Sequence, residues 1–172
     1  MCLKRGGDFI DFTNLDKMIK YIEKVASKSL PQAGEVAKEI VKDIIWKKLY
    51  QEYNPENYTR TYQFINSVRV GNIKQTSNGY TVPIYYDTSL IHPLETSSDE
   101  WNIHMNLYGG SESYALPYYL EQDNPGGAWR PREGIGAMQS VIDGDYDAHI
   151  RILQEIVLAL EKKGFVVAIE GK

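Results

Sequence analysis

An unbroken apolar stripe between residues 33 and 49 constrains the fold of this 172-residue chain more than any other feature. Apolar side chains recur there every three or four residues, and lysines and acids fill the positions between them. This spacing predicts an amphipathic helix, which is stable mainly because its stripe is buried against other elements. The stripe consists of Ala33, Val36, Ala37, Ile40, Val41, Ile44, Ile45 and Leu49.

The same spacing predicts two more helices. One begins at Thr13, which can cap it, and Pro31 ends or bends it because proline disfavours helical backbone before it. The other follows the acidic residues 143–147, and Gly164 can terminate it in the left-handed conformation. The apolar face of the first comprises Leu15, Met18, Ile19, Ile22, Val25 and Ala26. The predicted buried face of the last comprises Tyr146, His149, Ile150, Leu153, Ile156, Val157 and Leu160.

Strand signals lie between these helices. Residues 68–70 and 80–86 favour two strands of a hairpin, because Ser77-Asn78-Gly79 between them accepts positive φ. Pro83 then requires an edge or a bulge. Alternating apolar residues predict further strands at 101–107 and 114–120, and an apolar run predicts a short one at 165–169. Residues 121–145 have little periodicity and many Gly and Pro residues, which indicates a long loop.

Together these signals predict one α+β domain, with two N-terminal helices and one C-terminal helix packed on a small, mostly antiparallel sheet. We assign residues 13–172 to this domain and residues 1–12 to a loose N-terminal arm. Hydrophobic residues make up 42% of the chain, enough for a core, but no apolar run reaches the roughly 18 residues of a membrane-spanning helix. We therefore expect no membrane partner.

Charge is distributed unevenly along the chain. Residues 1–60 contain 11 Lys and Arg against 9 Asp and Glu, whereas residues 73–148 contain 3 against 11. The acidic half is typical either of a solvated surface or of a surface that repels polyanions. The formal net charge of −4 argues against a simple nucleic-acid binder.

No motif indicates catalysis. The single cysteine, Cys2, excludes an internal disulfide and a cysteine-based zinc site. The histidines lack the spacing of zinc motifs, and the glycines form no phosphate-binding loop. We therefore expect no catalytic residue, no metal and no cofactor. The alternative is a metal-dependent hydrolase or nuclease site built from His92, His104, Asp87 and Asp99.

Aromatic and arginine residues gather in the acidic, Gly-rich half. Tyrosine and tryptophan combine a large apolar face with a polar group, and Trp and Arg are favoured at the centres of protein interfaces. These residues therefore suggest a subunit interface, with ordinary edge packing as the alternative. The candidates are Tyr108, Tyr114, Tyr118, Tyr119, Trp129, Arg130 and Arg132.

A Tyr-rich pattern broken by a proline runs from Tyr50 to Thr61. It reads Tyr-x-x-Tyr-x-Pro-x-x-Tyr-x-Arg-Thr, and a serine follows shortly after. The pattern resembles the corner of the tail-completion proteins of long-tailed bacteriophages, a head–tail joining or neck family. The resemblance covers residues 15–93 and makes 94–145 an insertion. The matching corner positions are Tyr53, Pro55, Tyr58, Arg60, Thr61 and Ser67.

The resemblance implies a structural virion protein without enzymatic activity. It implies a homo-oligomeric ring in the tail or neck, assembled in the bacterial cytoplasm and contacting other neck and tail proteins. DNA passes through such a ring without specific binding, which fits an acidic surface. A second alternative is a soluble protein-binding module that uses its Tyr and Trp surface to hold one partner.

Overall fold

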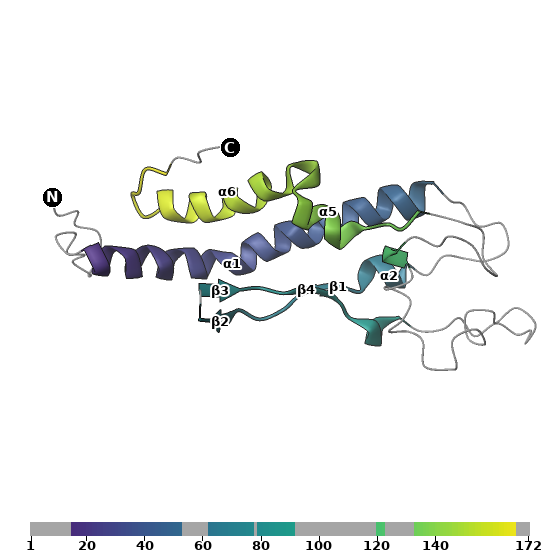
Figure 1. Cartoon of the computed structure of the whole chain (residues 1–172), viewed down its shortest axis with the longest axis horizontal. Helices are drawn as coiled ribbons and strands as arrows, with labels where there is room; N and C mark the ends of the chain where they lie inside the picture. The colour runs from purple at the N-terminus through teal and green to yellow at the C-terminus, as the bar shows by residue number, and fades with distance from the viewer. Residues whose placement is uncertain (1–14, 53–61, 78, 92–119, 123–132, 168–172) are drawn as a thin grey trace, which may run out of the picture.

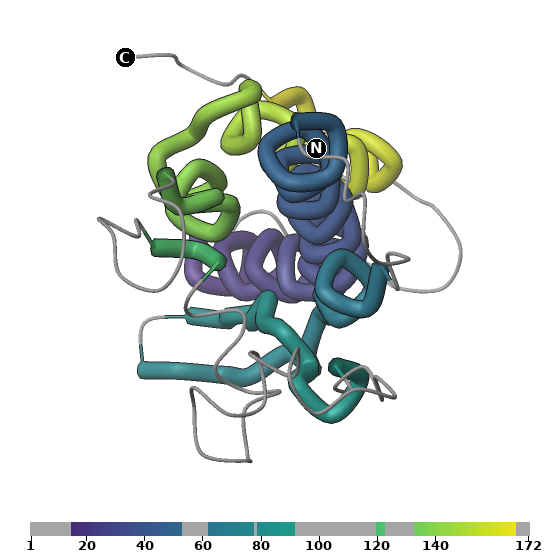
Figure 2. The backbone as a smooth tube through the Cα atoms, turned by 90° about the vertical axis from the view of Figure 1, so that its right-hand side faces the viewer, coloured from purple at the N-terminus to yellow at the C-terminus, as the bar shows by residue number. Residues whose placement is uncertain are grey.

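The computed structural model describes residues 15–52, 62–77, 79–91, 120–122 and 133–167. It is a mixed α+β fold that is mostly helical, as predicted. A long helix, α1 (Leu15–Ile45), runs between a β-hairpin on one side and helices α5 (Ala137–Asp143) and α6 (Ala148–Glu161) on the other (Figures 1 and 2). Within the described part of the chain, no helix is long and apolar enough to cross a membrane.

The two helices predicted on either side of Pro31 are one helix, so that division was wrong. Pro31 lies inside α1, which continues into a π-helical segment, η1 (Trp46–Gln51). A proline inside a helix removes one backbone hydrogen bond and bends the helix without having to end it. The direction of α1 changes between its N-terminal and C-terminal halves (Figures 1 and 2). Burial of the continuous stripe compensates for the lost bond.

The hairpin is formed by four short strands, β1 (Val68–Val70), β2 (Lys74–Thr76), β3 (Gly79–Thr81) and β4 (Ile84–Tyr86). Strand β1 pairs antiparallel with β4, and β2 with β3. The predicted single strand 80–86 is therefore split in two. Between the paired positions Val70↔Ile84 and Lys74↔Thr81, the first arm holds one residue more than the second, which is a bulge. Pro83 lies at this bulge, as the sequence required, and Gly79 adopts φ of 137° at the turn.

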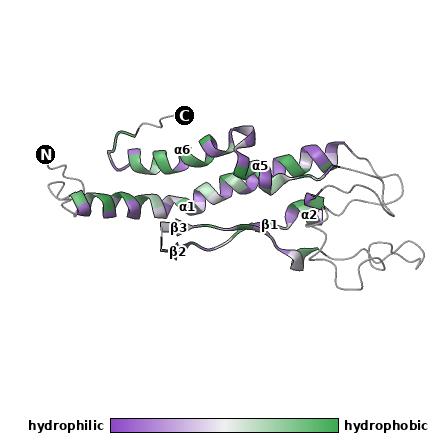
Figure 3. Cartoon of the chain, viewed as in Figure 1, coloured by the Kyte–Doolittle hydropathy of each residue, from purple (hydrophilic) through white to green (hydrophobic). Residues whose placement is uncertain are grey.

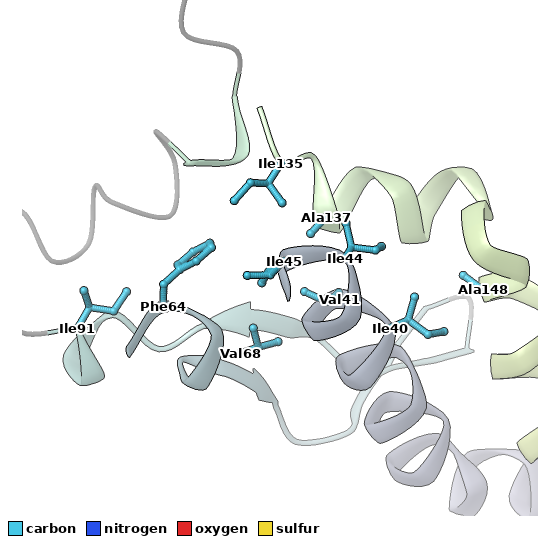
Figure 4. Packing of buried hydrophobic residues seen from close by; sticks show 10 residues of the cluster. All are labelled: Ile40, Val41, Ile44, Ile45, Phe64, Val68, Ile91, Ile135, Ala137 and Ala148. Atoms are coloured by element: carbon cyan, nitrogen blue, oxygen red, sulfur yellow. The ribbon is translucent and has the colours of Figure 1, made fainter. Parts of the chain in front are cut away.

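The core lies where α1, the hairpin and α5 meet (Figure 4). Two short helical segments flank the hairpin, α2 (Gln63–Asn66) before β1 and η2 (Thr88–Leu90) after β4. The stripe of α1 is buried, as predicted, and supplies four of the ten cluster residues, Ile40, Val41, Ile44 and Ile45. Each buried Ile or Val contributes about 1.5–3 kcal/mol. The cluster comprises Ile40, Val41, Ile44, Ile45, Phe64, Val68, Ile91, Ile135, Ala137 and Ala148.

Helix α5 was not predicted, because the region before residue 145 lacks apolar periodicity. Its start and end are both marked by glycines with positive φ, Gly136 at 58° and Gly144 at 82°. A 3-10 turn, η5 (Asp145–Asp147), then leads into α6, and Gly164 follows α6 with φ of 87°, as predicted. Residues 165–167 are not in a strand, contrary to the prediction.

The buried face of α6 agrees with the predicted stripe only in part. Leu160 is buried, as predicted, but Ala148, which lies outside the predicted stripe, is fully buried and Ile152 packs against the core, so the buried face is shifted relative to the prediction. Ile150 and Leu153 are exposed instead. His149 is also exposed, and its Nε2 lies 2.9 Å from the backbone oxygen of Ile142. Apolar and polar bands alternate along both long helices in Figure 3.

Candidate functional site: the loop-bearing end

Three segments of the chain begin and end at the same end of the molecule, which we call the loop-bearing end. The described residues that flank segments 53–61, 92–119 and 123–132 lie there together, at the right of Figure 1. Ile91 and Ile135, from two of these flanks, belong to one core cluster. Aromatic contacts and hydrogen bonds join the other flanks, so the described flanking residues form one connected base.

An aromatic cluster forms one side of the loop-bearing end. The rings of Trp46, Tyr50 and Tyr62 lie within 6.0 Å of one another, centroid to centroid. Trp46 and Tyr50 are four residues apart in the π-helical segment η1, and such segments are frequent at functional sites. The side chains of Trp46 and Tyr62 are about 40% exposed (43% and 39%), so the cluster presents an aromatic surface to solvent.

Tyr62 reaches this cluster from a strained backbone. Its φ is 55°, in the left-handed region that few residues other than glycine adopt. Two contacts keep Tyr62 in this conformation. The Tyr62 ring packs on the Tyr50 ring with 5.0 Å between centroids, and the Tyr62 carbonyl accepts a hydrogen bond from the Asn66 N–H at 3.1 Å. Strain of this kind persists only where the surroundings fix it, and it is common at binding sites.

Tyr86 and Glu121 form the other side. The Tyr86 ring stacks on Phe64 at 4.9 Å, and its hydroxyl donates a hydrogen bond to the carboxylate of Glu121. The second oxygen of that carboxylate accepts the Met138 N–H at 3.4 Å, at the start of α5. Burial, followed by the hydrogen bond and the negative charge of Glu121, raises the pKa of Tyr86, so the phenol keeps its proton and remains a donor.

Backbone hydrogen bonds join the segment after residue 119 to the segment after residue 132. The Ile135 N–H donates to the Leu120 carbonyl at 2.9 Å, and the Gly136 N–H donates to the Glu121 carbonyl at 3.1 Å. Lys48 of η1 donates to the Ile135 carbonyl at 2.9 Å. The flanks of segment 123–132 are therefore bonded to each other and to the extension of α1.

Most of the site residues predicted from sequence lie outside the described residues. This holds for the corner residues Tyr53, Pro55, Tyr58, Arg60 and Thr61, and for the whole predicted interface set: Tyr108, Tyr114, Tyr118, Tyr119, Trp129, Arg130 and Arg132. The segments that contain them all attach to the loop-bearing end. The strands predicted at 101–107 and 114–120 also lie outside, apart from Leu120.

Ser67 is the one predicted corner residue that the structure describes, and its role is structural. It is fully buried, and its hydroxyl donates to the Phe64 carbonyl at 2.6 Å. Its own carbonyl accepts the Asp87 N–H at 2.7 Å, which ties the end of α2 to the end of β4. Ser67 thus closes the turn that leads into the sheet.

Asp87 is the described member of the alternative metal site, whereas His92, Asp99 and His104 lie outside the described residues. Its carboxylate accepts the backbone N–H of Ser89 at 3.2 Å and the Ser89 hydroxyl at 2.6 Å, so it caps η2. No group of three or more His, Cys, Asp or Glu that could hold a metal occurs among the described residues.

Sequence reasoning did not identify the aromatic cluster or the Tyr86–Glu121 pair. Trp46 and Tyr50 have the i, i+4 spacing of neighbours on a helix, which was an available signal. Tyr86 and Glu121 are 35 positions apart, and nothing in the local sequence indicates their contact.

Comparison with known protein families decides the classification of the chain. The family YomN matches residues 14–132. The chain belongs to the YomN family. This family is associated with Bacillus phages and prophages, so the protein is phage-related, in line with the coarser part of the sequence prediction. The match includes both α1 and the hairpin, and it extends through residues 94–132. No curated protein matches the chain, and no solved structure matches it.

Proposed function

We propose that the protein is a structural, non-enzymatic component of a phage virion that joins the tail to the head or neck as a ring of identical subunits. The proposal starts from the phage association of its family. It adds the resemblance of residues 15–93 to the corner of tail-completion proteins. In this role the protein assembles in the bacterial cytoplasm, contacts other neck and tail proteins, and resides in the tail or neck.

The arrangement of the loop-bearing end is the observation that carries this proposal. A rigid core supports one end, where three segments rich in Tyr, Trp and Arg attach beside the exposed cluster of Trp46, Tyr50 and Tyr62. Aromatic and arginine side chains dominate the energetics of protein interfaces. An end built in this way suits contact with other proteins better than it suits enclosure of a small substrate.

The charge distribution supports passage of DNA without retention. Residues 73–148 carry 3 basic against 11 acidic residues. Affinity for DNA comes largely from contacts of Lys and Arg with phosphates, so an acidic wall repels the duplex. We propose that the acidic residues of this half that take no part in protein contacts face the DNA path in the assembled ring.

The test of the virion role uses the parent phage or prophage. Deletion of the gene should give filled heads and complete tails that are not joined, visible by negative-stain electron microscopy. The protein should also be present in purified wild-type particles by mass spectrometry. Joined, infectious particles from the deletion strain would overturn the proposal.

The test of the loop-bearing end uses two exposed aromatic residues. Trp46→Ala should reduce the incorporation of the protein into particles when it is supplied from a plasmid to the deletion strain. Tyr80→Ala is the matched control, because Tyr80 is similarly exposed (40% against 43%) but lies on the hairpin strand β3. Equal incorporation of both variants would remove the loop-bearing end from the proposal.

A further inference from the structure

Helix α6 carries an apolar surface that the described fold leaves uncovered. Ile150 and Leu153 are 51% and 43% exposed, and Val157, one turn further, is only partly buried. We call these three residues the α6 seam. Their spacing of three and then four residues places them on one side of the helix, and this is the spacing of the contact residues in paired helices.

The seam is not needed for packing within the chain. Helix α6 already buries another side, which includes Ala148 and Ile152, against α1 and the core. Leu160, about one turn beyond Val157, is buried too, so the exposed seam ends at Val157. Two more large apolar side chains are exposed at its N-terminal end, Ile142 at 66% and Tyr146 at 45%. Single exposed apolar residues are common, but a spaced row along one helix is typical of a protein contact.

The two ends of α6 carry opposite charge. Asp143, Asp145 and Asp147 are exposed at its N-terminal end, which gives a charge of −3. Lys162 and Lys163 are exposed just after its C-terminal end, beside the exposed Glu161, which gives a net charge of +1. None of these six residues forms an ion pair with another described residue. A second α6 that ran in the same direction would place acids against acids. One that ran in the opposite direction would place acids against lysines at both ends.

The acidic end is held in a fixed position. Tyr146 and Asp147 both have positive φ, 57° and 55°, and the Lys47 ammonium lies 4.9 Å from the centre of the Tyr146 ring. This contact anchors η5 to the extension of α1, about 21 Å from the C-terminal end of the 14-residue helix α6. The acids and the lysines are therefore separated by the full length of the helix and cannot pair with one another within one chain.

We propose that two copies of the chain pair through their α6 helices in antiparallel orientation. The seams pack against each other, and the acidic end of each helix faces the lysines of the other. The contact is isologous and closes as a pair. Opposed helix dipoles add to the complementarity. The pairing concerns the free protein before assembly, because an isologous pair has two equivalent faces whereas a ring between head and tail has two different ones. It goes beyond the virion role, because α6 lies away from the loop-bearing end (Figure 1).

A pair of matched leucine variants tests the seam. Leu153 and Leu158 lie on the same helix with 43% and 46% exposure, but they point to different sides of it. Leu153→Glu should raise the dissociation constant of the pair about thirtyfold or more, the effect of losing an interface anchor. Leu158→Glu should leave it unchanged. Sedimentation velocity over a concentration series measures both, and circular dichroism confirms that each variant folds.

Cysteine cross-linking tests the orientation of the two helices. With Cys2→Ser to remove the native thiol, Ile150→Cys and Val157→Cys are prepared as separate chains. An antiparallel pair brings position 150 of one chain near position 157 of the other. Oxidation of the mixture should therefore give a heterodimer in greater yield than either chain alone gives homodimer. More homodimer than heterodimer would overturn the antiparallel arrangement.

The outcomes separate this inference from the virion role. A wild-type protein that stays monomeric over the whole concentration series overturns the pairing. Self-association that Leu153→Glu and Leu158→Glu weaken equally, or not at all, overturns the seam as its site. Neither result bears on whether the deletion strain makes joined particles, so the virion proposal stands or falls on its own experiment.

Discussion

The hydroxyl of Tyr86 donates a hydrogen bond to the carboxylate of Glu121, 35 positions further along the chain. This bond joins the end of β4 to a residue that also accepts the Met138 N–H of α5 through its carboxylate and the Gly136 N–H, just before α5, through its backbone carbonyl. The carboxylate thereby connects the hairpin to the helical layer across the core. It also fixes the base from which residues 92–119 and 123–132 depart.

Removal of that hydroxyl should destabilise the fold. Tyr86→Phe leaves the half-buried carboxylate of Glu121 with the Met138 N–H but without the phenol donor, and hydrogen bonds to charged groups contribute about 1.5–3 kcal/mol. We expect the free energy of unfolding, measured in urea, to fall by about that amount. Tyr85→Phe is the control, because Tyr85 is the next residue and is 46% exposed, and it should change the value by less than about 0.5 kcal/mol. Equal effects of the two variants would contradict a structural role for the bond.

Stability should decrease at alkaline pH because of the same residue. The pKa of Tyr86 is raised in the folded protein above its ordinary value of about 10. Above pH 10 the unfolded chain therefore releases this proton while the folded chain keeps it. The unfolded state then binds fewer protons, and the free energy of unfolding falls with pH, by about 1.4 kcal/mol per unit for one group. The contribution is complete below about pH 10.

The comparison with Tyr86→Phe isolates this residue from the other tyrosines and the lysines, which titrate in the same range. The wild-type protein should lose stability between pH 10 and 11 more steeply than the variant. Parallel pH profiles for the two proteins would show that the phenol is not shifted.

At Gly34 the backbone of α1 lies close against the hairpin. A Cβ atom at this position would lie 2.7 Å from Val70 Cγ1 and 3.0 Å from Val82 Cγ1. Gly34→Leu should therefore lower the free energy of unfolding by about 1–3 kcal/mol through overpacking, although leucine favours a helix more than glycine does. Gln32→Leu, on the exposed side of the same helix, should be nearly neutral. Thermal or urea unfolding distinguishes them, and a stabilised Gly34→Leu would show that the layers can separate without cost.

Gly71 is required by the ring of Pro83 across the hairpin. A Cβ atom at residue 71 would lie 2.7 Å from Pro83 Cγ. Gly71→Ala should cost about 1–2 kcal/mol of stability in the wild type. The cost should be smaller when Pro83 is replaced by alanine, which gives a coupling of about 0.5 kcal/mol or more in a double-mutant cycle. Additive effects would show that the contact is relieved in another way.

The sequence could predict which types of residue are present near the candidate site, but it could not predict which of them contact one another. The Tyr-rich pattern around Pro55 predicted a corner through its resemblance to tail-completion proteins, and the aromatic and arginine content of 108–132 predicted interface candidates. Apart from Ser67, these residues lie outside the described part of the chain and stay predictions. The contact between Trp46 and Tyr62 depends on a left-handed backbone at Tyr62, which no propensity of tyrosine indicates. The bond from Tyr86 to Glu121 depends on long-range packing that leaves no local signal.

The sequence by itself determined the elements whose signal is local. Apolar residues recur with the helical period along the stripe of α1, so the residues alone predict a helix there. Gly79 and Gly164 lie where the backbone takes positive φ, which glycine adopts most easily, so the turn and the helix end also follow from the residues. Tertiary structure decided three others. Because its apolar stripe is buried, α1 continues past Pro31. Helix α5 has no periodic apolar pattern, and it forms because glycines begin and end it and Ala137 packs into the core. Packing of Ala148 on α1 selected which side of α6 is covered, because a helix with a wide apolar face can be buried on more than one side.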